Sequence, residues 1–154
     1  MNKAEMQELL RDEGAAAGLG VMGELPVIYW DNYCHGRIDF AWFIEGSRVP
    51  YAVFEIEGAN VPSESLQGDL RKFYWVGDSS GASIKKYILL YSHRAERTLV
   101  STPQKAVAAV QSKLRIEIAN NQQFANTTCE VLIDDSSFIE KIRAIAKSAL
   151  ECGL

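Results

Sequence analysis

The stretch that decides the fold runs from residue 36 to residue 73, GRIDFAWFIEGSRVPYAVFEIEGANVPSESLQGDLRKF. It opens with two apolar runs, Arg37–Ile44 and Tyr51–Glu57, that are rich in the aromatic and β-branched residues typical of strands. A glycine and a serine at 46–47 separate the runs, which indicates a hairpin. After a helix-start signal at 62–64, apolar residues recur at helical spacing, at Leu66, Leu70 and Phe73. The stretch therefore predicts two antiparallel strands followed directly by a helix.

The flanking sequence extends this pattern in both directions. Upstream, we expect a helix over Asn2–Ala17, a glycine-rich loop over Gly18–Gly23 and a strand over Leu25–Trp30. Downstream, the predicted elements are a turn at Asp78–Ser83, a buried strand at Tyr87–Tyr91, a helix from Pro103 to about Ile118, a strand at Cys129–Ile133 and a last helix capped by Asp135 or Ser136.

This order of elements predicts an α/β fold. The first three strands can form an antiparallel meander, and each later strand, reached through a helix, would join it in a mixed sheet. We expect a three-layer sandwich around a central mixed β-sheet, with the core order αβββαβ and a C-terminal α-β-α extension. The 154 residues fit one domain of ordinary size, residues 1–154.

Composition narrows the class of protein further. The net charge of −4 counts against a protein that coats nucleic acid non-specifically, although a local basic face can coexist with an acidic whole. No segment has the charge pattern of a secretory signal or the apolar length of a membrane span. The three cysteines form no CxxC pair, which predicts reduced thiols and a cytoplasmic location.

Three acidic residues fall in the two central strands. Asp39 lies inside the strand predicted at Arg37–Ile44. Charged residues are depleted in strand interiors, so an aspartate at this position requires an explanation. Glu55 and Glu57 are two residues apart on the second strand, so both side chains point to one face, and the hairpin brings Asp39 within reach of them. Such a cluster repels itself unless a cation joins it, and Mg²⁺ suits carboxylate oxygens. A strand whose glutamates simply face solvent is the alternative explanation.

At this point the sequence resembles a known family. GRIDFAWF, VPYAVFEIE and SLQGDLRKF are similar to the motif segments of the PD-(D/E)XK nuclease superfamily, which includes restriction endonucleases, junction resolvases and repair nucleases. The resemblance covers about the first 90 residues and matches the superfamily's core order. It implies a DNA endonuclease that hydrolyses phosphodiester bonds with Mg²⁺ or Mn²⁺. Asp39 and Glu55 would be metal ligands and catalytic residues.

One position departs from the superfamily pattern. Glu57 stands where the usual lysine is expected, and some restriction enzymes of the superfamily carry a glutamate there. Glu57 would then complete the metal site or act as general base. In other members the lysine has moved to the following helix, which makes Lys72 the candidate catalytic lysine, with Arg71 second. Gln67 and Arg71 on that helix, and His35 before the first strand, are candidate contacts to the substrate.

Three hypotheses remain open on sequence alone. The chain is a Mg²⁺-dependent endonuclease, or a catalytically inactive member of the same fold that binds nucleic acid or protein, or an unrelated α/β protein with surface acids. Nucleases of this fold that cut both strands are often dimers, so the resemblance also implies DNA as a partner and a possible homodimer.

Overall fold

The computed structural model describes residues 1–28, 34–80, 83–92 and 102–152, except for the side chains at 28, 34–35 and 78–80. The elements in chain order are α1 (Lys3–Ala16), β1 (Gly20–Ile28), β2 (Cys34–Phe43), β3 (Ala52–Gly58), α2 (Ser63–Ser80), β4 (Lys85–Tyr91), α3 (Pro103–Asn120), the 3₁₀ turn η2 (Gln122–Phe124), β5 (Glu130–Ile133) and α4 (Phe138–Cys152). The α/β class predicted from the sequence is confirmed.

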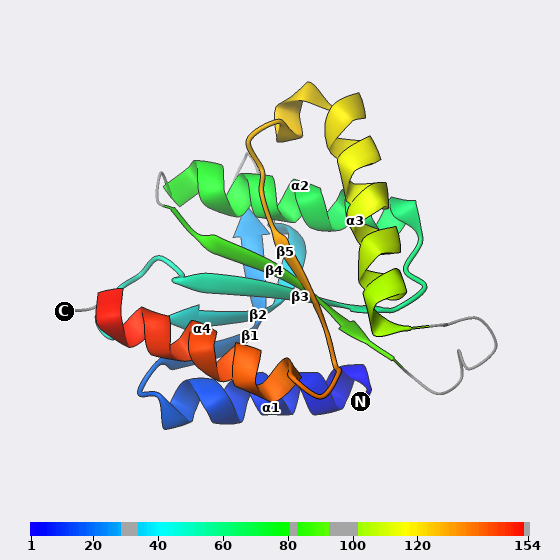
Figure 1. The fold of residues 1–154 in the computed structure, drawn as a ribbon. Coiled ribbons are helices and arrows are strands. Elements are labelled where there is room, and N and C mark those ends of the chain that lie inside the picture. Colours follow the sequence, from blue (N-terminus) through cyan, green and yellow to red (C-terminus); the bar gives the residue numbers. More distant parts are fainter. Residues whose placement is uncertain (29–33, 81–82, 93–101, 153–154) are drawn as a thin grey trace.

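The five strands form one mixed sheet in the order β1-β2-β3-β4-β5. The first three strands are an antiparallel meander, whereas β4 runs parallel to β3 and β5 parallel to β4. Helices α1 and α4 cover one face of the sheet and α2 and α3 cover the other (Figure 1). This arrangement makes three layers, because each parallel connection passes through a helix that must pack on the sheet.

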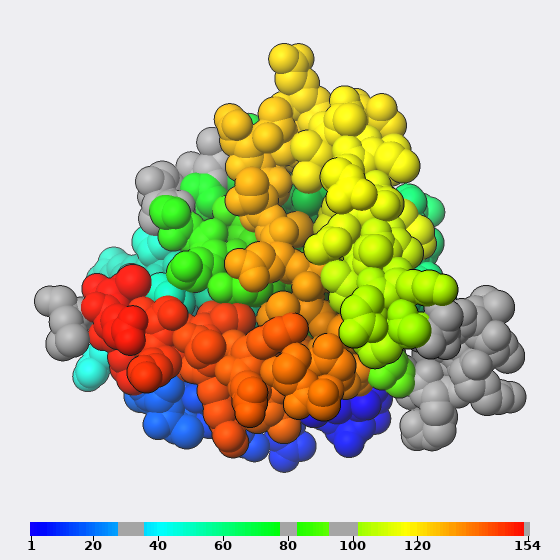
Figure 2. Space-filling model, viewed as in Figure 1, coloured from blue at the N-terminus to red at the C-terminus, as the bar shows by residue number. Residues whose placement is uncertain are grey.

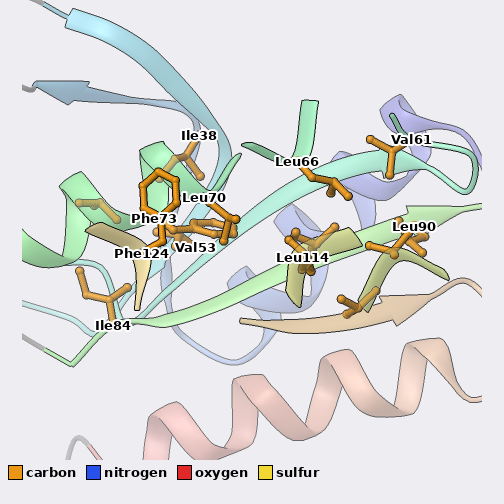
Figure 3. Packing of buried hydrophobic residues seen from close by; sticks show 14 of the residues in the cluster. Ile38, Val53, Val61, Leu66, Leu70, Phe73, Ile84, Leu90, Leu114 and Phe124 are labelled. Carbon is orange, nitrogen blue, oxygen red and sulfur yellow. The ribbon is translucent and has the colours of Figure 1, made fainter. Parts of the chain in front are cut away.

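The two faces of the sheet carry separate cores. Under α2 and α3, apolar side chains from both helices meet those of the sheet, and Figure 3 shows this cluster, with Leu70 and Phe73 of α2, Leu114 of α3 and Val53 of β3 among the labelled residues. Under α1 and α4, the ring of Phe54 lies between Trp42 and Tyr87, with centroids 4.8 and 5.4 Å away. Alternation along β3 divides its side chains, since Val53 joins the first core and Phe54 and Ile56 join the second.

Two sequence predictions of local structure are wrong. The loop expected at Gly18–Gly23 is mostly strand, because β1 begins at Gly20, which pairs with Phe43. The turn itself covers Ala17 and Gly18, and the φ of 81° at Gly18 favours glycine. The turn expected at Asp78–Ser83 is wrong over its first residues, because α2 continues to Ser80, and residues 81–82 lie outside the described residues. Packing against the sheet through buried Phe73 and Val76 outweighs the low helix propensity of its last residues.

Within the described ranges, the helices lack the combination of length and low charge that a membrane crossing requires.

Candidate catalytic site

Asp39 and Glu55 lie where β2 and β3 stop pairing through their backbones. The paired residues run from Trp42 opposite Ala52 to Phe40 opposite Phe54, so Asp39 and Glu55 occupy the next opposed positions. There the carboxylates replace backbone carbonyls as acceptors. The Asp39 N–H donates to Glu55 Oε1 at 2.8 Å, and the Ile56 N–H donates to Asp39 Oδ2 at 2.8 Å. The two acids are thereby held at fixed positions in the opening between the strands.

Both carboxylates are buried and have lysine partners. Glu55 is 1% exposed and Asp39 is 9% exposed, and buried charges are costly unless they are paired. Lys72 from α2 forms an ion pair with Glu55 and donates to the backbone oxygen of Arg37 at 3.1 Å. Lys3 from α1 forms an ion pair with Asp39 Oδ1 at 3.0 Å. Cations from both helix layers therefore meet the acids from the sheet.

Asp69 is a fourth acid in the site, and sequence reasoning missed it. It lies on α2 one turn before Lys72, is 3% exposed, and has Oδ1 3.9 Å from Lys72 Nζ. Its Oδ2 is fully buried and has no hydrogen-bond donor among the described residues. Hydrogen bonds link the Asp69 carboxyl to Glu55 and Glu57, so both glutamates face α2, as the alternation on β3 predicts.

The electrostatics of this cluster favour a shared proton. Burial, followed by the hydrogen bonds to Glu55 and Glu57, raises the pKa of Asp69 to about 12. Burial also raises the pKa of Glu55, although its hydrogen bond with Asp69 and the charge of Lys72 act in the opposite direction. Burial, the largest single influence, would lower the pKa of Lys72, but the combined attraction of Glu55, Asp69 and Asp39 outweighs burial and raises it. These influences favour a protonated Asp69 beside the contact between Glu55 and Lys72.

The edge strand β1 is distorted at the same level of the sheet. Glu24, between the residues that pair with Ile38 and Phe40, has a φ of 55°, a left-handed conformation that residues other than glycine rarely adopt. Its carboxylate also contributes to the field that favours the charged form of Lys3. Strained backbone of this kind persists where surrounding structure over-determines it, often at functional sites.

The oxygens of the site suit a hard cation in chemistry but are not arranged as a ready ligand set. In the described part of the chain, no three acidic, histidine or cysteine side chains stand in a geometry that would hold a metal ion. Asp39 Oδ1 and Glu55 Oε2 are instead neutralised by lysines. Lys3 is 48% exposed on its side chain, so solvent can replace its contact with Asp39 at little cost. Mg²⁺ is held by carboxylates together with waters, and withdrawal of Lys3 would free Asp39 Oδ1 for such an ion, whereas Glu55 Oε2 is paired with Lys72.

The other residues predicted to contact substrate lie at the margin of this cluster. On α2, Gln67 is half-buried and Arg71 is exposed. Neither makes a hydrogen bond or ion pair with the carboxylates among the described contacts. The side chain of His35 lies outside the described residues. Their role as substrate contacts stays a prediction.

The sequence carried a signal for one of the two missed partners. Asp69 follows Leu66 by three residues and precedes Phe73 by four, which places it on the buried face of α2 by helical period. A buried aspartate three residues before Lys72 is an expected ion-pair position. Lys3 had no such signal, because only the tertiary packing of α1 brings it to Asp39, 36 positions later in the chain.

Comparison with known proteins adds nothing to this geometry, because no family model, no curated protein and no solved structure matches the chain.

Proposed function

We propose that this protein is a Mg²⁺-dependent DNA endonuclease, with Asp39, Glu55 and Lys72 as the centre of its active site. The observation that carries the proposal is the ion pair between Lys72 and Glu55, formed beside the reciprocal hydrogen bonds of Asp39 and Glu55. Glu57 occupies the position where the resembled superfamily has lysine. An ammonium that arrives from α2 supplies the missing charge, in the way expected for members whose lysine has moved to that helix.

The chemistry of the site supports phosphodiester hydrolysis. A Mg²⁺ ion held by Asp39 and Glu55 would neutralise charge on the scissile phosphate. Lys72 is fixed between Glu55 and the Arg37 carbonyl, so its ammonium is pre-oriented to stabilise the charge that develops on the phosphate oxygens. Glu57 is only partly buried, so water reaches its carboxylate, and it is the candidate general base. The strain at Glu24 is also in keeping with a functional opening between the strands.

The test is cleavage of duplex, branched and single-stranded DNA in Mg²⁺ or Mn²⁺. We expect Asp39→Asn and Lys72→Met each to lower the cleavage rate by at least about a hundredfold, the usual size of a lost general-acid or electrostatic contribution. Glu45→Gln, an exposed acid of the β2–β3 turn, is the matched control and should leave the rate unchanged. Absence of cleavage of every substrate with both metals would refute the proposal.

A non-catalytic binding module is the second candidate. It is favoured by the lysine partners of Asp39 and Glu55 and by the absence of a ready ligand set among the described residues. This candidate predicts DNA or protein binding without cleavage, and no Mg²⁺-dependent rise in melting temperature. Nucleases of the resembled fold that cut both strands of a duplex are often dimers, and gel filtration of the purified chain would detect a homodimer.

A further inference from the structure

A second polar site lies on the same face of the sheet, at the opposite end of the parallel strands from Glu57. Lys86 is the second residue of β4, and its half-buried side chain lies in a hollow of about 510 Å³. The hollow is walled by α2, by η2 and by the segment that leads to β5, which lies at the surface beside α2 (Figure 2). Its lining residues are Phe73, Tyr74, Gly77, Lys86, Gln122, Gln123, Asn126 and Thr127.

Among the described side chains, none offers a carboxylate to the ammonium of Lys86. Its Nζ donates to the backbone oxygen of Ile84 at 3.2 Å, and the described residues offer it no ion pair. Gly77 makes room for it, because a Cβ at that position would lie 3.2 Å from Nζ. The thiol of Cys129 is a further neighbour, but burial raises the pKa of Cys129 to about 11, so the thiol stays neutral. Burial also lowers the pKa of Lys86, which indicates that its charge is poorly compensated.

The polar lining of the hollow complements an anion. Three side-chain amides, of Gln122, Gln123 and Asn126, and the hydroxyl of Thr127 supply hydrogen-bond donors around the lysine. The described lining contains no aspartate or glutamate, although the chain as a whole carries a net charge of −4. A compact lysine charge surrounded by several neutral donors is better matched to the many oxygens of a phosphate group than to a carboxylate.

We propose that this hollow is a binding site for a phosphate group, with Lys86 as its charged contact and the amides of Gln122, Gln123 and Asn126 as hydrogen-bond donors. The site is separate from the cluster around Glu55 and does not depend on nuclease activity. A phosphate on a small metabolite and a phosphate of a nucleic-acid backbone share this chemistry, and the experiment distinguishes the two.

The experiment is a titration of the intact chain followed by two-dimensional amide NMR, at constant ionic strength with chloride as reference. The probes are inorganic phosphate, a nucleoside monophosphate and a short single-stranded oligonucleotide. We expect saturable shifts at Lys86 and over residues 122–127. Tighter binding of the monophosphate than of the oligonucleotide identifies a small-molecule site, and the reverse order identifies a backbone contact.

Adjacent lysines provide the matched variants. Lys86→Met keeps the buried length of the side chain and should weaken phosphate binding by about tenfold or more, the effect of losing one charged hydrogen bond. Lys85→Met removes the exposed lysine that precedes Lys86 in the chain. It should change the affinity for phosphate by less than about twofold, as expected for a solvent-screened surface charge. Equal losses in both variants, or no saturable binding by the wild-type chain, would overturn the proposal.

A second measurement needs no substitution. An acylating reagent modifies the neutral amine of a lysine, and peptide mass spectrometry reports modification of Lys85 and Lys86 separately. Phosphate should slow modification of Lys86 and leave Lys85 unaffected. Equal protection of both lysines would contradict a specific site.

Discussion

Phe54 and Glu55 are neighbours on β3 but belong to opposite faces of the sheet, and the two faces differ in kind. On the side of α1 and α4, Phe54 is enclosed by aromatic rings and the described core is apolar. On the side of α2, the apolar core is interrupted by Glu55, Asp69 and Lys72. The first face contributes apolar packing. The second face holds buried charges that packing does not require. Buried charges usually lower stability, and this arrangement is expected of a functional site.

The largest effect should follow from breaking the apolar face. Phe54→Ala removes a fully buried ring and should lower the free energy of unfolding by about 3–5 kcal/mol, from lost burial and the cavity left behind. Urea denaturation measures the change. Phe54→Leu, which keeps most of the volume, is the control and should cost clearly less. A loss below about 1 kcal/mol in the alanine variant would show that this face repacks easily.

On the polar face, removing one charge should cost less than removing the ring but should be strongly coupled to its partner. Lys72→Met leaves Glu55 buried without its ammonium and should cost about 1–3 kcal/mol. Adding Glu55→Gln should restore part of that loss, because the uncompensated charge is then gone. Arg71→Met, an exposed neighbour on α2, is the control for stability. If the two changes in the free energy of unfolding simply add, as measured by urea denaturation, the ion pair between Lys72 and Glu55 contributes no interaction free energy.

The polar face should also make stability depend on pH. The folded chain holds the Asp69 proton far above the ordinary pKa of 3.8, while the unfolded chain releases it near that value. Stability from this group is complete below about pH 4 and falls as pH rises, by at most about 1.4 kcal/mol per pH unit. The raised pKa of Glu55 acts in the same direction.

Urea midpoints between about pH 6 and pH 9, a range in which ordinary carboxylates do not titrate, would measure this slope. Asp69→Asn keeps a hydrogen-bond donor but has no proton to lose, so its slope should be flatter than that of the wild-type chain. Equal slopes for the two proteins would mean that Asp69 is ionised in the fold.

The difference between the two faces also explains which features the sequence predicts. Strand alternation and helical spacing located the elements around Phe54 and Leu66, because burial of apolar side chains follows the period of the backbone. The same alternation put Glu55 and Glu57 on one side. The loop expected at Gly18–Gly23 failed because pairing with β2 accommodates glycines that local propensity assigns to a turn.

The sequence indicates some residues of the candidate site but not the contacts between them. Asp39 and Glu55 stand out because a charge inside a strand is unusual, whereas Lys72 is a candidate only through the resemblance to nucleases whose lysine has moved to the following helix. The reciprocal bonds of Asp39 and Glu55 depend on the strands separating after Phe40, which no local pattern encodes. The contact from Lys3 depends on how α1 packs, so it is a property of tertiary structure alone.

The smallest expected change in stability concerns that contact. Lys3 is at the start of α1 with about half of its side chain exposed, so its ion pair with Asp39 should contribute no more than about 1 kcal/mol. Lys3→Met should therefore leave urea stability nearly unchanged. If the proposed magnesium site is correct, the same substitution should tighten Mg²⁺ binding, measured by calorimetry, because a competing cation no longer neutralises Asp39 Oδ1.

Arg143→Met is the matched control, since it removes a comparable surface ion pair, with Glu13, that lies away from the carboxylates of β2 and β3. Its Mg²⁺ affinity should equal that of the wild-type chain. Weaker Mg²⁺ binding by the Lys3→Met variant would mean that Lys3 supports the site rather than competing with the ion for Asp39. Because stability barely moves in either variant, a change in affinity can be assigned to the charge beside Asp39, which Lys3 reaches from α1.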